Sequence, residues 1–165
     1  MATNKTARSS SRRSVPKKAT RSTKKSSKSA VGIYTVPRGN VSIAVPSFWT
    51  LRQTNDDLEV EAPSGATSVI VTAFQRNGRS TALDAREYLG HFLETAPRNG
   101  RLSKDRGTKQ RATARYKDPE GDNWEIVFIS NGKTLLLATC NTSFASAHKE
   151  AKTGLQVMES LKLKK

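Results

Sequence analysis

The order of apolar and polar positions changes near residue 30, and from there it predicts short strands. Val41, Ile43 and Val45 lie two residues apart, so they share one face of an extended segment. The segment 57–62 alternates acidic and apolar side chains, with Leu58 and Val60 on the apolar face, which is typical of a half-exposed strand. We therefore predict strands at 33–36, 41–45, 49–52 and 58–62.

Three later segments are apolar on both faces. They lie at 68–75, 124–129 and 135–140, and each has large aliphatic or aromatic residues at successive positions. A strand with two buried faces belongs to a sheet that is covered on both sides, most simply by helices. Asn131-Gly132 stands between the last two segments and is a strong signal for a two-residue hairpin turn.

Two segments have helical periodicity. The first runs over 81–96, is capped by Ser80 or Thr81 and ends before Pro97. Its apolar stripe consists of Leu83, Tyr88, Leu89, Phe92 and Leu93. The second helix runs over 146–161 with a stripe of Ala147, Ala151, Leu155, Met158 and Leu161, and Gly154 weakens it by about 1 kcal/mol relative to alanine.

One further strand is predicted at 109–117, with a cationic outer face. Ala112, Ala114 and Tyr116 alternate there with Arg111, Thr113, Arg115 and Lys117. The whole order predicts an α+β fold: an α/β/α sandwich with a central, mainly antiparallel sheet covered by helices on both faces. We expect one such domain at 31–165, preceded by a disordered tail at 1–30.

Charge separates the tail from the rest of the chain. The net charge is +15, and ten of the 29 lysines and arginines lie within residues 1–30, which contain no acidic residue. The remainder has 19 basic and 14 acidic residues, a net charge of +5. The tail also has almost nothing to bury, so the cost of ordering it, about 1–2 kcal/mol per residue, favours disorder until a polyanion binds.

The tail is expected to bind phosphates without reading bases, because no aromatic residue interrupts its cations. The predicted polyanion-binding residues are Arg8, Arg12, Arg13, Lys17, Lys18, Arg21, Lys24, Lys25 and Lys28. A solubilising extension, an organelle transit peptide and a contact to anionic membranes or acidic proteins are the other interpretations of this composition.

A second basic stretch lies at 98–117, with eight basic residues and Asp105 as its one acid. Its predicted contact residues are Arg98, Arg101, Lys104, Arg106, Lys109, Arg111 and Arg115. Arg-Asn-Gly-Arg occurs at 76–79 and again at 98–101, which is consistent with two turns flanked by solvated charges. The alternative is a cationic patch beside the sheet that extends the anion-binding surface of the tail.

The titratable residues form no recognisable catalytic or metal-binding motif. His91 follows Glu87 by one helical turn, but the pattern offers no third ligand, and His148 stands on the other predicted helix. Cys140 lies in an apolar strand, where a thiol behaves as a small apolar residue. The acidic stretch 118–122 fits a hairpin turn better than a calcium loop. We expect no catalytic residues, no metal and no cofactor.

The sequence from Val45 to Trp49, Val-Pro-Ser-Phe-Trp, ends an early strand, and a helix, a two-sided hairpin and a closing helix follow. This order resembles the PsbP-like superfamily, which includes the photosystem II extrinsic protein, a Ran-binding import adaptor and DcrB-like domains. The resemblance covers about residues 33–163. It implies a sandwich that binds other macromolecules and no shared catalytic residues. The apolar signal of the exported members and a motif for Ran binding are both missing from this sequence.

Composition narrows the class of protein further. A single cysteine cannot form an intramolecular disulfide, and the sequence has neither an apolar run of about 18 residues nor an apolar secretory signal. We expect a cytoplasmic, non-enzymatic interaction protein that is tethered to nucleic acid or another polyanion by its tail and binds a protein partner through its folded part. A protein-binding adaptor or inhibitor-like module with a merely solubilising tail, and a small enzyme with an unrecognised pocket, are the alternatives.

Overall fold

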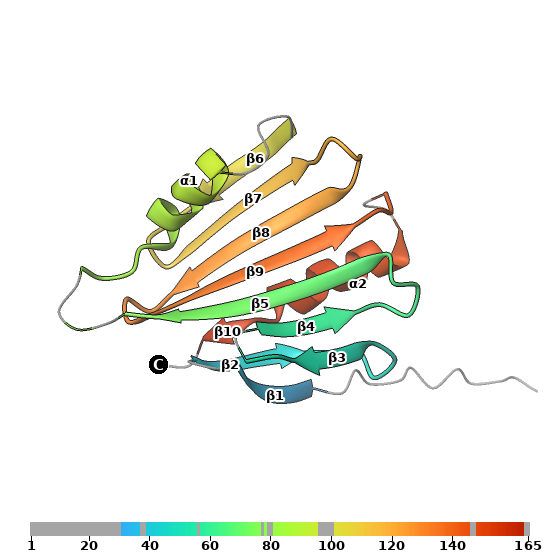
Figure 1. Cartoon of the computed structure of the whole chain (residues 1–165), viewed down its shortest axis with the longest axis horizontal. Coiled ribbons are helices and arrows are strands. Elements are labelled where there is room, and N and C mark those ends of the chain that lie inside the picture. The colour runs from blue at the N-terminus through green and yellow to red at the C-terminus, as the bar shows by residue number, and fades with distance from the viewer. Residues whose placement is uncertain are drawn as a thin grey trace, which may run out of the picture.

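The computed structural model describes residues 31–36, 39–55, 57–76, 78, 81–95, 101–145 and 148–163. The predicted tail and its nine contact residues lie outside this range. Within it the chain forms ten strands and two helices (Figure 1). They are β1 (Val31–Val36), β2 (Gly39–Ala44), β3 (Thr50–Gln53), β4 (Asp57–Glu61), β5 (Thr67–Gln75), α1 (Ala85–Thr95), β6 (Arg101–Gly107), β7 (Arg111–Lys117), β8 (Asn123–Ser130), β9 (Thr134–Thr142), α2 (Lys149–Glu159) and β10 (Lys162–Leu163).

The strands form two antiparallel sheets. The large sheet has seven strands in the order β3-β4-β5-β9-β8-β7-β6, and the small sheet has the order β1-β2-β10. Every strand pair in both sheets is antiparallel. The predicted α+β fold with a mainly antiparallel sheet is therefore confirmed. The Asn131-Gly132 turn between β8 and β9 is also confirmed, with Gly132 at a positive φ of 84°.

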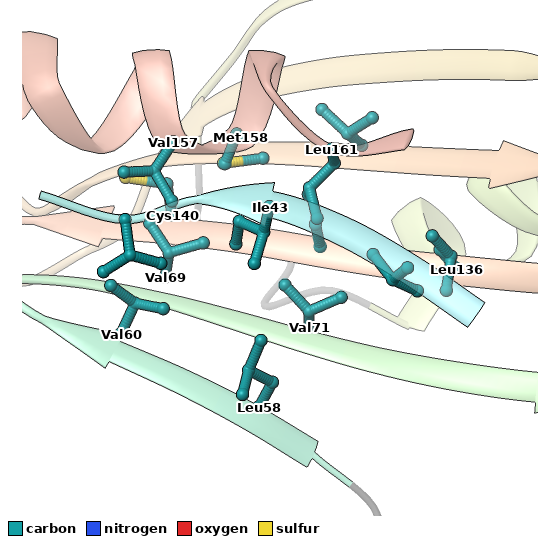
Figure 2. Close-up of a cluster of buried hydrophobic side chains, with 14 of the residues drawn as sticks. Ile43, Leu58, Val60, Val69, Val71, Leu136, Cys140, Val157, Met158 and Leu161 are labelled. Carbon is teal, nitrogen blue, oxygen red and sulfur yellow. The ribbon is translucent and has the colours of Figure 1, made fainter. Parts of the chain in front are cut away.

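The larger core lies between α2, the small sheet and one face of the large sheet. Alternate residues of β4, β5 and β9 point into it, and so do the predicted inward residues of β2 (Figure 2). Val157 and Met158 of α2 lie over Val69 and Cys140. Trp49 also belongs to this cluster. We call this side of the large sheet the α2 face.

The smaller core lies under α1. Ile126 and Phe128 of β8 pack with Leu89 of α1, while Val127 between them belongs to the larger core. Because successive strand residues point to opposite faces, the two helices pack on different sets of residues of the same sheet. The start of α1 differs from the prediction, since Asp84 replaces Ser80 or Thr81 as the cap. Its Oδ1 accepts hydrogen bonds from the backbone N–H groups of residues 86 and 87.

The cover of the sheet by helices is less complete than predicted. The segment 68–75 was expected to be buried on both faces, but Ile70 is 37% exposed and Phe74 is 44% exposed. Figure 1 shows α1 beside β6 and β7, several strands away from β5. One helix is too narrow to cover seven strands, so the far part of this face stays uncovered by the described chain.

Gly154 explains why α2 accepts a residue that weakens helices. A Cβ atom there would lie 2.8 Å from Sγ of Cys140 and 3.0 Å from Cγ2 of Thr67. The glycine thus allows the helix backbone to approach the sheet closely. The helix is shorter than the predicted 146–161 and begins at Lys149, after His148 accepts a hydrogen bond from the backbone N–H of Glu150.

Two strands were not predicted. β10 has two residues and extends the small sheet. β6 occupies residues 101–107 of the basic stretch 98–117, so this part of the stretch forms the edge strand of the large sheet. Its sequence, Arg-Leu-Ser-Lys-Asp-Arg-Gly, lacks the apolar alternation that identifies the other strands.

Candidate functional site

The predicted basic patch is divided by the structure. Arg98 lies outside the described residues, and Arg101 and Lys104 are placed only by the backbone of β6. Arg106 lies near the end of β6, Lys109 in the turn that follows, and Arg111 and Arg115 on β7. The confirmed alternation of β7 buries Ala112 and Ala114 and leaves both of its arginines exposed.

A tight hairpin brings β6 and β7 together. The hydroxyl of Thr108 accepts hydrogen bonds from the backbone N–H groups of Gln110 and Arg111, at 3.3 and 3.2 Å. At the hairpin base, a Cβ atom on Gly107 would lie 2.4 Å from Cα of Ala112, so a side chain there has no room. The register that results places Arg106 opposite Thr113.

Three arginines consequently stand close together on the α2 face. Thr113 pairs with Val127, which belongs to the larger core beneath α2, so Thr113 and its cross-strand neighbour Arg106 lie on that face. Arg111 and Arg115 lie two residues to either side of Thr113 and share its face. The sequence predicted these arginines as contact residues, and the pairing of β6 with β7 supplies their arrangement.

Two adjoining cavities lie between these strands and α2, and we call them together the α2 groove. The first has a volume of about 280 Å³ and is lined by residues that include Cys140, Ala151 and Trp124. The second has a volume of about 250 Å³ and is lined by residues that include Arg106, Arg111 and Thr113. Arg115, Glu125 and Leu155 line both cavities. The groove therefore has a more apolar end and a cationic end.

An ion pair lies where the two cavities meet. Nε of Arg115 donates to Oε2 of Glu125, and this hydrogen bond is the main cause that raises the pKa of Arg115 above its ordinary value. The side chain of Glu125 is only 15% exposed, whereas that of Arg115 is 54% exposed. A carboxylate at this depth is stabilised by its arginine partner. We expect the pair to fix the wall of the groove.

Cys140 forms part of the floor of the first cavity. Burial raises the pKa of its thiol to about 12, and the nearby carboxylate of Glu125 acts in the same direction. The thiol is therefore protonated at neutral pH, and the thiolate is the nucleophilic form. This agrees with the interpretation of Cys140 as a small apolar residue.

The acidic stretch 118–122 forms the turn between β7 and β8, as predicted. Gly121 has a φ of 96°, and Oδ1 of Asp118 accepts the backbone N–H of Asp122. Nε1–H of Trp124 donates to the other carboxylate oxygen of Asp118 at 2.8 Å, which lowers the pKa of that carboxyl. Trp124 also stacks on Tyr116, with ring centroids 5.8 Å apart. The carboxylate thus has a structural partner.

The two histidines stand apart. His91 lies on the exposed side of α1, with Glu87 at 3.9 Å and Glu94 at 3.5 Å. His148 caps α2, and its ring stacks on Phe144 at a centroid distance of 3.9 Å. Among the described residues, no group of three or more His, Cys, Asp or Glu side chains is arranged to hold a metal ion.

Several residues of the groove were not singled out from the sequence. Thr113 and Leu155 were assigned to a strand face and to the core stripe of a helix, and Glu125 and Glu159 were not noticed. Leu155 is only partly buried because it lies at the edge of α2 above β7 and β8. The one signal that points to these residues is the pairing of two cationic strands, which the sequence did not reveal.

Comparison with solved structures identifies the fold of the chain. No protein-family model and no curated protein matches the chain. The solution structure of cyanobacterial PsbP (CyanoP) from Synechocystis sp. PCC 6803 aligns with a TM-score of 0.59 and 12% identity, over 87% of this chain and 98% of that one. The chain has a PsbP-like fold. The resemblance inferred from the element order is thus confirmed at the level of the fold.

A second solved structure also aligns with this chain. It is a crystal structure from Bacteroides thetaiotaomicron VPI-5482, with a TM-score of 0.49 and 16% identity. The alignment covers 76% of this chain and 45% of that one, so this chain spans less than half of that protein.

Neither helix of the described chain has the length and apolar content needed to cross a bilayer.

Proposed function

We propose that this PsbP-like chain is a non-enzymatic interaction protein that binds a polyanion, such as nucleic acid. The single observation that supports this most is the convergence of Arg106, Arg111 and Arg115 on one groove of the sheet. Their charge adds to that of the tail, whose cations neutralise phosphates without reading bases. The fold is compatible with a binding role, and Cys140 and His148 have structural surroundings.

The proposal is tested by titrating a fluorescent DNA duplex with the full-length protein at several salt concentrations. The comparison is with a full-length variant in which the nine predicted tail residues are replaced by glutamine. If about six to eight tail cations contact phosphates, the logarithm of the affinity falls with the logarithm of the salt concentration with a slope of about −5 to −7. The variant is expected to lose most of this slope.

Equal affinities of the two proteins, or an affinity that does not depend on salt, would contradict tethering by the tail. The double variant R106Q/R111Q separates the contribution of the groove. It is expected to lower the slope by about 2, because each phosphate contact contributes about 0.9. The matched control R52Q removes an arginine on β3 that is ion-paired to Glu61 at 3.5 Å and is expected to change little.

A second function, as a protein-binding adaptor, is favoured by the uncovered part of the sheet. Ile70 and Phe74 of β5 are exposed, and so is Tyr88 of α1. Exposed aromatic residues are enriched in protein interfaces. Under this alternative, I70S/F74S abolishes capture of a protein partner, and nuclease treatment does not affect that capture. Loss of the partner on nuclease treatment would instead favour the nucleic-acid interpretation.

A further inference from the structure

Two arginines in the second cavity of the α2 groove are available to a ligand. Arg115 is held by Glu125, but within the described chain neither Arg106 nor Arg111 has an ion-pair partner. Diagonal neighbours on adjacent antiparallel strands lie about 7–8 Å apart, a distance that two arginine side chains close easily. Arg106 and Arg111 stand in that relation, so their guanidinium groups can reach one shared anion.

The anion that suits this pair is a phosphate. Guanidinium groups bind phosphate oxygens through two parallel hydrogen bonds, and such charge-assisted bonds are roughly twice as strong as neutral ones. Thr113 lies opposite Arg106 and two residues from Arg111, and it lines the same cavity, so its hydroxyl can supply a further donor. Glu159 of α2 also lines the cavity, so three arginines face two carboxylates there and the balance remains cationic.

The first cavity extends the site beyond its charged end. Cys140, Ala151 and Leu155 provide an apolar lining, and the raised pKa of Cys140 is consistent with restricted access of water there. Its volume of about 280 Å³ is near the lower limit of small-molecule sites, which begin at about 300 Å³. Such sites combine an apolar cavity with a few placed polar groups. The α2 groove has both, and they lie at opposite ends.

We propose that the α2 groove binds a phosphate ester. Its phosphate lies between Arg106 and Arg111, beside the hydroxyl of Thr113, and its uncharged body lies over Cys140 and Leu155. A free nucleotide-sized ester and the phosphorylated end of a nucleic-acid strand offer the same chemistry. This site does not depend on polyanion binding by the tail, because it requires the cavity as well as the charge.

Calorimetric titration of the full-length protein with adenosine 5′-monophosphate, inorganic phosphate and adenosine tests the site. The monophosphate is expected to bind at least about tenfold more tightly than either of its parts, because hydrogen bonds to charged groups and apolar burial both contribute. Equal binding of inorganic phosphate and the monophosphate would overturn the role of the first cavity.

Substitutions then assign the two ends. R106Q/R111Q is expected to weaken the monophosphate at least about tenfold, while R52Q leaves it unchanged. Ala151 lines the first cavity and not the second, so A151L narrows the first cavity and is expected to weaken the monophosphate but not inorganic phosphate. E159Q removes a repelling charge and is expected to tighten both. Because E159Q predicts a gain and lies on the exposed side of α2, it remains informative if the double arginine variant does not fold.

Unchanged affinity in R106Q/R111Q, or weaker phosphate binding in E159Q, would overturn the site. Displacement of the monophosphate by oligothymidylate distinguishes the two sources, with the tail residues replaced by glutamine. Displacement that requires a 5′-phosphate assigns the groove to strand ends, and no displacement assigns it to free esters; both outcomes support the site. Displacement by the unphosphorylated strand contradicts it. The two proposals can fail separately. If the tail variant binds DNA as well as the native protein does but the monophosphate still binds, tethering by the tail is contradicted and the phosphate-ester site is kept.

Discussion

The α2 face of the large sheet has opposite character at its two ends, although the same hydrogen-bonded rows run through both. One row passes from Ala73 through Leu136 and Ile129 to Arg111, and its aliphatic members lie beneath α2 and the small sheet. A second row on the same face, two rows away, passes from Val69 to Arg115. Moving across the four strands from β5 to β7 thus replaces a buried aliphatic side chain by an exposed guanidinium group.

The width of the sheet explains this change. Seven strands spaced about 4.8 Å apart span about 29 Å, whereas a helix with its side chains is about 10–12 Å wide. α2 contacts β5 and β9, and the small sheet adds cover at β5. The face of β6 and β7 is left without an apolar partner in the described chain, so polar side chains are favoured there. The uncovered end is where a ligand has access.

The contrast between the two ends of the α2 face is tested most strongly by substitutions along one row of paired residues. L136A is expected to destabilise the protein by about 2–5 kcal/mol, because Leu136 is fully buried and its loss leaves a cavity. R111Q, at the other end of the same row, is expected to change the free energy of unfolding by less than about 0.5 kcal/mol. Urea unfolding followed by tryptophan fluorescence measures both. Similar losses in the two variants would contradict the division of this face.

Replacing either of two helical glycines by alanine is expected to change the free energy of unfolding, but in opposite directions. G154A is expected to destabilise the protein by about 1–3 kcal/mol, because the new methyl group would meet Sγ of Cys140 at 2.8 Å. G90A is the control: a Cβ atom on Gly90 of α1 has no atom within 4 Å, so helix propensity alone is expected to stabilise it by about 0.5–1 kcal/mol. Thermal unfolding distinguishes the two, and a stabilising G154A would show that α2 does not lie as close to the sheet as described.

The part of the large sheet that lies beneath α2 and the small sheet could be predicted from the sequence, because burial leaves a pattern of apolar positions. Leu58, Val60 and Ala62 alternate with acidic residues, and the consecutive apolar residues of β8 require two buried faces. The Asn131-Gly132 turn fixed the order of β8 and β9. These local signals were sufficient for the fold class. They overestimated the burial of Ile70 and Phe74, because apolar content alone does not reveal how far a helix reaches across a sheet.

At the end of the sheet formed by β6 and β7, the sequence predicted which residues are cationic but not how they are arranged. The sequence indicated Arg106, Arg111 and Arg115 as cationic contacts, but β6 has no apolar alternation and its pairing with β7 rests on backbone hydrogen bonds and the Thr108 turn. The place of Arg106 opposite Thr113 is a matter of register, which a one-residue shift would change. A site assembled from two strands and a helix far apart in the chain leaves no motif in any one of them.

Cys140 lies at the border between the two ends, since it touches Gly154 and also lines the first cavity, and it provides the smallest expected effect. Burial raises the pKa of its thiol from 9.0 to about 12, so the folded protein holds the proton more tightly than the unfolded chain. The resulting stabilisation is fully present below pH 9 and is lost as the pH rises from about 9 towards 12.

C140A removes this dependence. The difference in the free energy of unfolding between the variant and the native protein is therefore expected to shift in favour of the variant by about 1 kcal/mol between pH 8 and pH 10. Subtracting the two proteins at each pH cancels the titration of their lysines and tyrosines. A difference that stays constant from pH 8 to pH 10 would mean that water reaches the thiol. The apolar end of the groove would then be wet, and the contrast between the two ends of the face would be weaker than the burial of Cys140 implies.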